Sequence, residues 1–307
     1  MSGKSPCAIP IIVTVLIMIF LIVVAVLLAV VITINRTKSK FKDNYSTGII
    51  EYCESVQNVA YTGPIIYPEN RKLYNKELAQ NLYTTCLNTT ASNCYNNFDI
   101  PMPIGYNRKV RLIGKNPVTQ KPQMFAIVFT NENMNKMLVS FTATFWLDSW
   151  LIDASFGQVP PNVLNGYQRG QMVHKGFYNT YLEVRNEVWK MFNAGNFDEL
   201  IITGHSLGGA LSSICAFDFY KQNPILYTFG SPRVFNNTMA LAMEQYLPDG
   251  KFRIANVQDT VTTVPFPTLL KTNYTHIDQL ISLNVNLGTL SGNHVIAYKE
   301  FMPESQI

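Results

Sequence analysis

Charge is sparse in this sequence, and clustered basic residues are lacking. Asp, Glu, Lys and Arg make up 14% of the 307 residues, and the formal net charge is only +4. Because the basic residues are scattered rather than grouped with aromatic residues, the sequence argues against a nucleic-acid-binding surface. His, Cys, Asp and Glu show no spacing typical of a metal site, so we expect no metal and no other cofactor.

Low-complexity segments and internal repeats are also lacking. Hydrophobic residues make up 47% of the chain, which is enough apolar material for one sizeable core or two small ones. We therefore expect a folded protein rather than a disordered chain or a repeat array.

One long hydrophobic run is present, at residues 11–34. It extends over about 24 residues without a charge, whereas a helix needs about 20 to cross the hydrocarbon core of a bilayer. A cleaved signal peptide has a shorter apolar region of about 7–15 residues and a small-residue cleavage site. The run therefore predicts a single transmembrane anchor, which argues against a channel or transporter. The predicted organisation is a flank (1–10), the anchor, a juxtamembrane linker (35–48) and a folded domain (49–307).

The side of the membrane that this domain faces is left open by the sequence. Lys and Arg are more numerous on the C-terminal flank of the anchor, which by the positive-inside rule favours a cytoplasmic domain. Sequons of the form Asn-x-Ser/Thr would suit a lumenal domain, but their number is close to that expected by chance. They lie at Asn35, Asn44, Asn88, Asn236 and Asn273.

Cysteine usage does not decide the compartment either. Only Cys86 and Cys94 have a spacing that suits a disulfide. Cys215 falls inside a predicted helix, where we expect a buried free thiol.

The chain after the linker shows a pattern typical of an α/β protein. A helix is predicted at 73–87, and the Asn-, Pro- and Gly-rich residues 88–105 predict a loop. Three β-prone runs follow, at 109–113, 124–130 and 137–142. Helices then alternate with strands, the helices at 177–192, 207–220 and 239–246 and the strands at 200–203, 225–229 and 252–256. This alternation predicts a largely parallel sheet covered by helices.

The junction between the strand at 200–203 and the next helix contains Gly204-His205-Ser206-Leu207-Gly208. Gly-x-Ser-x-Gly in this context is typical of a nucleophilic serine on a sharp turn, where larger residues than glycine would collide with the neighbouring strand and helix. The amide of Leu207 at the helix N-terminus is then able to stabilise developing negative charge. The alternative is an ordinary βα turn that binds phosphate, but no Lys follows the glycines, which excludes a Walker loop.

A nucleophilic serine requires a histidine base and a carboxylate that orients it. The chain has four histidines, and in this architecture the acid and the base follow the serine, which excludes His174. His205 lies beside Ser206 within the turn and is expected to point away. We predict His294 as the base, because it lies in a loop-to-helix segment, and we interpret His276 as a partly exposed strand residue.

The carboxylate is predicted by the same elimination. Asp218 lies in the middle of a predicted helix, Asp249 in a Pro-Asp-Gly turn and Asp278 within a strand-like segment. Only Asp259 directly follows the C-terminal end of a strand, where the sites of α/β proteins form. We therefore predict Asp259 as the acid.

Four spaced motifs resemble those of the class 3 lipases, the fungal triacylglycerol lipase-like group. They are GHSLGGA at 204–210, VHKGF at 173–177, YTFGSPRV at 227–234, and Asp259 followed by Pro265. The similarity covers roughly residues 73–298. It implies an α/β-hydrolase fold with a mostly parallel central sheet and a triad of Ser206, Asp259 and His294, in agreement with the elimination above.

The sequence departs from the family at one motif. The family has Phe-Arg-Gly followed by Thr or Ser, whereas this chain has Phe141-Thr142-Ala143-Thr144. The resemblance implies that the hydroxyl of Thr144 and the amide of Leu207 form the oxyanion hole. The methyl group of Ala143 is expected to slow turnover or to change the acyl group that is accepted, and the alternative for Thr144 is a plain strand-end residue.

The next residues, 145–153, look like the lid of this family. Such a lid covers the site in water and opens at a lipid surface, because its apolar face gains more from lipid than from solvent. The predicted lid residues are Trp146, Leu147, Trp150 and Leu151. The alternative is an ordinary amphipathic helix of the core.

Together these features predict a membrane-anchored serine hydrolase that cleaves carboxylic esters of lipids in the manner of a triacylglycerol lipase. We expect a lipid or another ester as the substrate and the membrane as a partner through residues 11–34. Phospholipase A1 and an esterase for soluble esters remain alternatives of the same class. The alternative from another class is a non-catalytic lipid-binding protein that retains the hydrolase fold.

Overall fold

The computed structural model describes residues 53–54, 56, 59–95, 98–117, 119–143, 157–269, 272–277 and 279–305. The chain divides into two units, Met1–Glu51 and Tyr52–Ile307, and the described residues all belong to the second. The predicted anchor at 11–34 and the linker at 35–48 lie outside the described residues. Within the described ranges, no helix combines the length and the apolar character needed to cross a bilayer.

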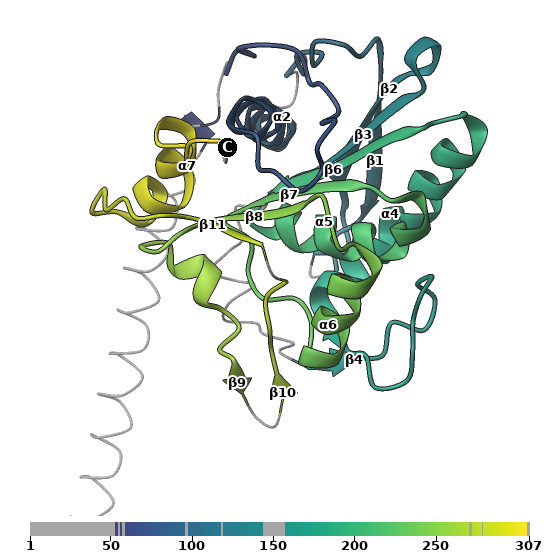
Figure 1. Cartoon of the computed structure of the whole chain (residues 1–307), viewed down its shortest axis with the longest axis vertical. Helices are drawn as coiled ribbons and strands as arrows, with labels where there is room; N and C mark the ends of the chain where they lie inside the picture. Colours follow the sequence, from purple (N-terminus) through teal and green to yellow (C-terminus); the bar gives the residue numbers. More distant parts are fainter. Residues whose placement is uncertain are drawn as a thin grey trace, which may run out of the picture. The chain divides into compact units, whose positions relative to one another are not determined.

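Within the described residues, a seven-stranded sheet forms the centre of the domain (Figure 1). Its strand order is β1-β2-β3-β6-β7-β8-β11. β1, β2 and β3 pair antiparallel, whereas β3, β6, β7, β8 and β11 run parallel. The strands are β1 (Arg108–Lys115), β2 (Pro122–Asn131), β3 (Lys136–Phe141), β6 (Glu199–His205), β7 (Ile225–Phe229), β8 (Lys251–Asn256) and β11 (Leu280–Leu283). The predicted α/β class with a mostly parallel sheet is thereby confirmed.

Helices cover both faces of this sheet (Figure 1). One face carries α4 (Lys175–Ala194), α5 (Leu207–Asp218) and α6 (Asn237–Tyr246), and the other carries α2 (Lys76–Cys94) and α7 (Ala297–Glu300). The sheet is apolar on both faces because its central strands are buried on both sides. In β6, for example, Ile202 packs into the core with α5, whereas its neighbour Ile201 packs into the core with α2.

Two short strand pairs complete the described part of the domain. β4 (Gln158–Val159) pairs antiparallel with β5 (Val173–His174), and β9 (Thr268–Leu269) pairs antiparallel with β10 (Thr272–Asn273). The β9–β10 pair projects away from the central sheet (Figure 1).

The predicted loop at 88–105 is wrong in its first part, because α2 continues through Cys94. Asn88, Thr89 and Thr90 are fully or almost fully buried in this helix. Their polar side chains have partners there: Asn88 donates to the Val59 carbonyl and Thr89 to the Ser140 hydroxyl. Tertiary contacts thus override the weak helix propensity of Asn and Thr.

The predicted Cys86–Cys94 disulfide is also wrong. Both residues belong to α2, and eight residues of helix separate them by about 12 Å along the axis, which is beyond the reach of a disulfide. Cys94 is bonded instead to Cys53, with the two Cα atoms 5.7 Å apart. Cys86 is a buried free thiol, and Cys215 is one as predicted.

Candidate active site

Ser206 occupies a strained turn between β6 and α5. Its φ of 59° and ψ of −124° place it in a region that costs a non-glycine residue about 1–3 kcal/mol. The turn is held by a hydrogen bond of 2.9 Å from the Ser206 amide to the Phe229 carbonyl on β7. Strain of this kind presents the serine side chain at the end of the strand, as the sequence motif predicted.

The glycines around Ser206 allow strand, turn and helix to pack closely. A Cβ atom on Gly204 would lie 2.1 Å from the carbonyl oxygen of Gly208, and one on Gly208 would lie 2.4 Å from the carbonyl oxygen of Phe141. Both distances are far below van der Waals contact. The predicted collision with the neighbouring helix and strand is therefore the reason for glycine at both positions.

His294 and Asp259 meet beside this turn. Asp259 follows β8, and His294 lies on a π-helical turn, η4 (Gly292–Ile296), that precedes α7. Nδ1 of His294 is 2.8 Å from Oδ2 of Asp259. The pair packs against Gly230, where an added Cβ would lie 3.0 Å from Asp259 Oδ2 and 3.1 Å from the imidazole. The structure thus brings together the two residues that the sequence predicted as base and acid.

Two polar atoms of this group have no hydrogen-bond partner among the described residues. They are Oγ of Ser206 and Nε2 of His294, both on residues that are almost fully buried. A buried polar group left unpaired costs about 1–3 kcal/mol, so such groups are rare unless they have another role. Because Nδ1 of His294 donates to Asp259, Nε2 carries a lone pair that is able to accept a proton.

The carboxylate of Asp259 has three donors in the described part of the chain. Oδ1 accepts from the amide of Val261 at 3.0 Å, and Oδ2 accepts from His294 and from the hydroxyl of Tyr298 at 2.7 Å. Burial and the nearby carboxylate raise the pKa of Tyr298 well above its usual value, so this hydroxyl remains protonated and donates. These donors stabilise an ionised carboxylate in a position with no solvent exposure.

His205 contacts His294 instead of merely pointing away. Its Nε2 lies 2.7 Å from the carbonyl oxygen of His294, and the two ring centroids are 4.5 Å apart. Complete burial and the neighbouring imidazole lower the pKa of His205 well below its usual value, so it is neutral. His205 is therefore a support for the segment that carries His294 rather than a second base.

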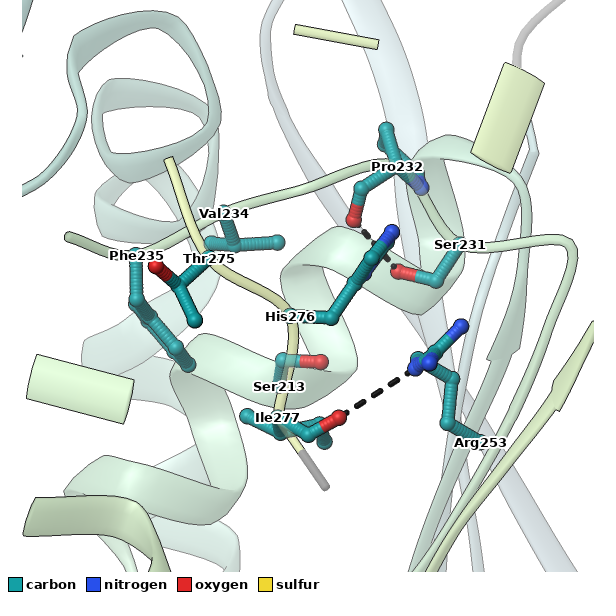
Figure 2. A pocket seen from close by; sticks show the side chains of 9 residues that line it. All are labelled: Ser213, Ser231, Pro232, Val234, Phe235, Arg253, Thr275, His276 and Ile277. Carbon is teal, nitrogen blue, oxygen red and sulfur yellow. Dashed lines mark hydrogen bonds between the residues drawn. The ribbon is translucent and has the colours of Figure 1, made fainter. Parts of the chain in front are cut away.

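The other two histidines lie in surroundings of their own. His276 lines a cavity of about 10 Å³, beside Ser231 and Arg253 (Figure 2), and its Nε2 contacts the Thr262 carbonyl. Burial, reinforced by Arg253, lowers the pKa of His276 to about 3. His174 caps α4 by accepting from the Phe177 amide, and burial lowers its pKa to about 4.

Asp218 lies at the C-terminal end of α5 rather than in the middle of a helix. Its carboxylate forms a bidentate ion pair with Arg185 and accepts from Tyr181 and Trp189, all three on α4. This buried network joins α4 to α5. The network explains why a carboxylate is buried at this position, and no catalytic role for Asp218 is needed.

The end of β3 is held by polar side chains of α2. The amide nitrogen of Asn93 donates to the hydroxyl of Thr142 at 3.0 Å, and the Ala143 amide donates to the hydroxyl of Thr90 at 3.1 Å. Thr142 and Ala143 are fully buried. These are the two residues that replace the family's Arg and Gly, so α2 fills the surroundings of this motif with its own polar groups.

Leu207 begins α5, and its amide therefore has no acceptor within the helix. The other predicted oxyanion donor, Thr144, lies outside the described residues. So do the predicted lid residues Trp146, Leu147, Trp150 and Leu151.

Sequence reasoning missed the residues that support the triad candidates, above all Tyr298. A signal for it was present, because Tyr298 follows His294 by four residues, the spacing that places two side chains on one face of a helix. The roles of Asn93 and Thr90 carried no such signal, because they depend on the packing of α2 against β3. Among the described residues, no group of three or more His, Cys, Asp and Glu side chains is arranged to hold a metal ion.

Comparison with known proteins identifies relatives of this domain. Residues 138–269 match the family described as lipase (class 3). A lipase of Rhizomucor miehei is 34% identical over 122 residues, which are 36% of this chain and 32% of that one. A secreted mono- and diacylglycerol lipase of Malassezia globosa is 33% identical over 138 residues, 40% of this chain and 44% of that one. The chain thus spans less than half the length of these two relatives.

The fold agrees with these matches. A crystal structure of the mono- and diacylglycerol lipase of Aspergillus oryzae is similar with a TM-score of 0.54 and 20% sequence identity, over 70% of this chain and 82% of that one. At this identity the likeness establishes the α/β-hydrolase fold. Residues 138–269 thus resemble the class 3 lipases in sequence, and the described domain has the α/β-hydrolase fold.

Proposed function

We propose that this chain is a membrane-anchored serine hydrolase that cleaves carboxylic esters of lipids, with acylglycerols as the substrate class. The observation that supports this most strongly is that a strained, buried Ser206 directly follows His205, which contacts His294, while His294 is hydrogen-bonded to Asp259. The two atoms that would exchange the proton, Oγ of Ser206 and Nε2 of His294, are both buried without a hydrogen-bond partner among the described residues. The acylglycerol class is inferred from the names of the relatives.

In the proposed reaction, His294 Nε2 takes the proton of Ser206 as its Oγ attacks the acyl carbonyl carbon. The tetrahedral oxyanion is stabilised by the amide of Leu207 and by the hydroxyl of Thr144. Protonated His294 then gives the proton to the leaving alcohol, which leaves an acyl-serine. Water activated by His294 hydrolyses this ester and releases the fatty acid. Asp259 remains ionised throughout and holds the imidazole in the tautomer that leaves Nε2 free.

The lid residues Trp146, Leu147, Trp150 and Leu151 are proposed to cover this site in water and to contact acyl chains at a lipid surface. The anchor at 11–34 keeps the domain near such a surface. Both features favour an insoluble substrate over a soluble ester.

A lipid-class panel tests the proposed substrate. The full chain in mixed micelles is incubated with tri-, di- and monoacylglycerols, a phosphatidylcholine and a p-nitrophenyl ester, and fatty acid release is measured against Ser206→Ala. We expect release from acylglycerols that the variant lacks. Preferential release from the sn-1 position of the phospholipid would support phospholipase A1 instead, and no release from any substrate would support a non-catalytic lipid-binding protein.

The domain is proposed to face an oxidising compartment, contrary to the charge distribution around the anchor. The Cys53–Cys94 disulfide supports this, because such bonds persist in the secretory pathway and outside cells and are rare in the cytosol. The name of the Malassezia relative, a secreted lipase, agrees with this side.

The sequon at Asn273 provides a test of this orientation. Asn273 is exposed on β10, whereas Asn88 is fully buried in α2, so a glycan is compatible with the fold only at the former. The full chain is expressed in a eukaryotic secretory host and treated with an endoglycosidase. We expect the treatment to lower the apparent mass of the wild type on a denaturing gel. Asn273→Gln should remove one glycan and Asn88→Gln none. If the chain carried no glycan and all four cysteines after the anchor were free thiols, the domain would face the cytoplasm.

A further inference from the structure

Asn256 contacts both the acid of the proposed site and the segment that carries the base. It is the last residue of β8 and is fully buried. Its carbonyl accepts from the amide of Asp259 at 3.0 Å, and its own amide donates to the hydroxyl of Tyr298, also at 3.0 Å. Tyr298 in turn donates to the Asp259 carboxylate. The main chain of Asn256 thus contacts the acid directly and through Tyr298.

The side chain of Asn256 contacts the segment that carries the base. Its Nδ2 donates to two carbonyl oxygens, that of Val285 at 2.8 Å and that of Asn293 at 3.0 Å. Its Oδ1 accepts from the amide of Val285 at 3.0 Å. Val285 lies at the start of the loop that follows β11, and Asn293 lies in the first turn of η4, directly before His294.

These contacts close the loop from within. Both hydrogens of the amide are used, each on a carbonyl at a different end of the loop, so the side chain fixes the distance between those ends. Inside the loop, the amide of Leu287 donates to the side chain of Asn293 at 2.7 Å. A loop held in this way has little freedom to move His294 relative to β8, and β8 carries Asp259.

We propose that Asn256 is a positioning residue, whose side-chain amide sets the place of His294 relative to Asp259 by closing the 285–293 loop. The proposal rests on the proposed hydrolase function. It requires both donors of the amide, because a single hydrogen bond would fix only one end of the loop. Aspartate at this position keeps the shape and the acceptor for Val285 but loses both donors and places negative charge against two carbonyl oxygens.

The substitution Asn256→Asp tests this proposal in the full chain, with p-nitrophenyl butyrate in detergent micelles as the substrate. A fluorophosphonate titration of Ser206 counts the folded active sites, so that kcat refers to competent enzyme. We expect kcat to fall by about 10²-fold with little change in KM. A displacement of the base by about 1 Å affects the chemical step and not substrate binding.

Asn88→Asp is the matched control. Asn88 is equally buried, and its Nδ2 also donates to a backbone carbonyl, that of Val59, but it lies on α2 and has no hydrogen bond to the described residues of the site. Its replacement is expected to lower the unfolding temperature without lowering kcat per titrated site. If Asn256→Asp behaved in the same way, Asn256 would have a structural role only, and the proposal would be overturned.

A second variant covers the case in which Asn256→Asp does not fold. Asn256→Ser retains one hydroxyl donor without added charge, so it is able to hold at most one end of the loop. We expect an intermediate loss of kcat from it, and an unchanged kcat would overturn the proposal. A wild type that neither hydrolyses the ester nor reacts with the fluorophosphonate would overturn the hydrolase function, and the positioning role with it.

Discussion

The hydroxyl of Tyr298 donates to Oδ2 of Asp259 at 2.7 Å, the same oxygen that accepts from His294 Nδ1. One carboxylate oxygen thus serves both the proposed base and a phenol that stays protonated. The second donor restrains the orientation of the carboxylate that His294 contacts. Tyr298 is therefore expected to affect the reaction without touching the substrate.

Tyr298→Phe removes this hydroxyl and preserves the ring packing. The Asp259 oxygen loses one donor, and the amide of Asn256 loses its acceptor, so we expect a loss of about 1–3 kcal/mol in unfolding free energy. We also expect kcat to fall by roughly tenfold with an unchanged KM. Steady-state kinetics and urea unfolding of the full chain measure both. A normal kcat would show that the two remaining donors suffice to hold Asp259.

Restoring the family motif at the end of β3 is expected to harm this protein. Thr142 is fully buried, and its hydroxyl is bonded to Asn93 of α2. Thr142→Arg would bury a charged guanidinium in place of a hydroxyl whose hydrogen bond Asn93 supplies, at a cost of about 3–5 kcal/mol. Ala143→Gly adds no charge and should cost about 1 kcal/mol or less. A stable Thr142→Arg variant with raised activity, measured by thermal unfolding and ester hydrolysis, would contradict this account of the motif.

Stability is expected to decline in mild acid because of buried histidines. Burial lowers the pKa of His174 to about 4 and that of His276 to about 3, whereas both titrate near 6.5 in the unfolded chain. The unfolded state therefore takes up protons below pH 6.5 that the folded state does not. The unfolding free energy should fall by about 1.4 kcal/mol per pH unit for each histidine, and the decline should level off only near pH 4 and pH 3.

Urea unfolding between pH 7 and pH 5 measures this slope. His276→Gln retains a donor for the Thr262 carbonyl. It should reduce the dependence of the unfolding free energy on pH by about 1.4 kcal/mol per pH unit, the contribution of one histidine. An identical slope in the variant would mean that His276 titrates normally in the folded protein.

Much of the fold followed from the sequence because its signals are local. The β7 strand has the predicted ends, and β6, α5 and β8 differ from the prediction by only a few residues, since each is a continuous apolar run between turn residues. The turn at Ser206 was predicted because residues larger than glycine at 204 and 208 would collide with the neighbouring backbone. The end of α2 was not predicted, because Asn88 and Thr89 are helical only through partners on distant segments.

For the site, too, only residues with a local sequence signal could be predicted. Ser206, Asp259 and His294 could be singled out because each lies at a recognisable position on a strand end or loop. Cys53 could not be paired with Cys94 by spacing, because their approach depends on how the chain returns to α2 after the linker. The role of Asn256 could not be predicted either, because it depends on contacts with a loop that is distant in sequence. Val285, for example, is 29 residues away.

The lid remains a prediction that function alone tests. Trp150 is expected to face acyl chains at a lipid surface, where burial of apolar area contributes about 25 cal/mol per Å². Trp150→Ala should therefore lower activity on emulsified acylglycerol much more than on a soluble p-nitrophenyl ester. Equal losses on both substrates would indicate a tryptophan of the core.

Covalent labelling tests most directly whether Ser206 is a nucleophile activated by His294 and Asp259. The full chain in detergent is treated with a fluorophosphonate, and the modified peptide is located by mass spectrometry. We predict a single adduct on Ser206, no adduct in Ser206→Ala, and labelling slowed by roughly 10⁴-fold in His294→Ala or Asp259→Asn that remain folded. No adduct on Ser206 in the folded wild type, or equally fast labelling in His294→Ala, would contradict the account.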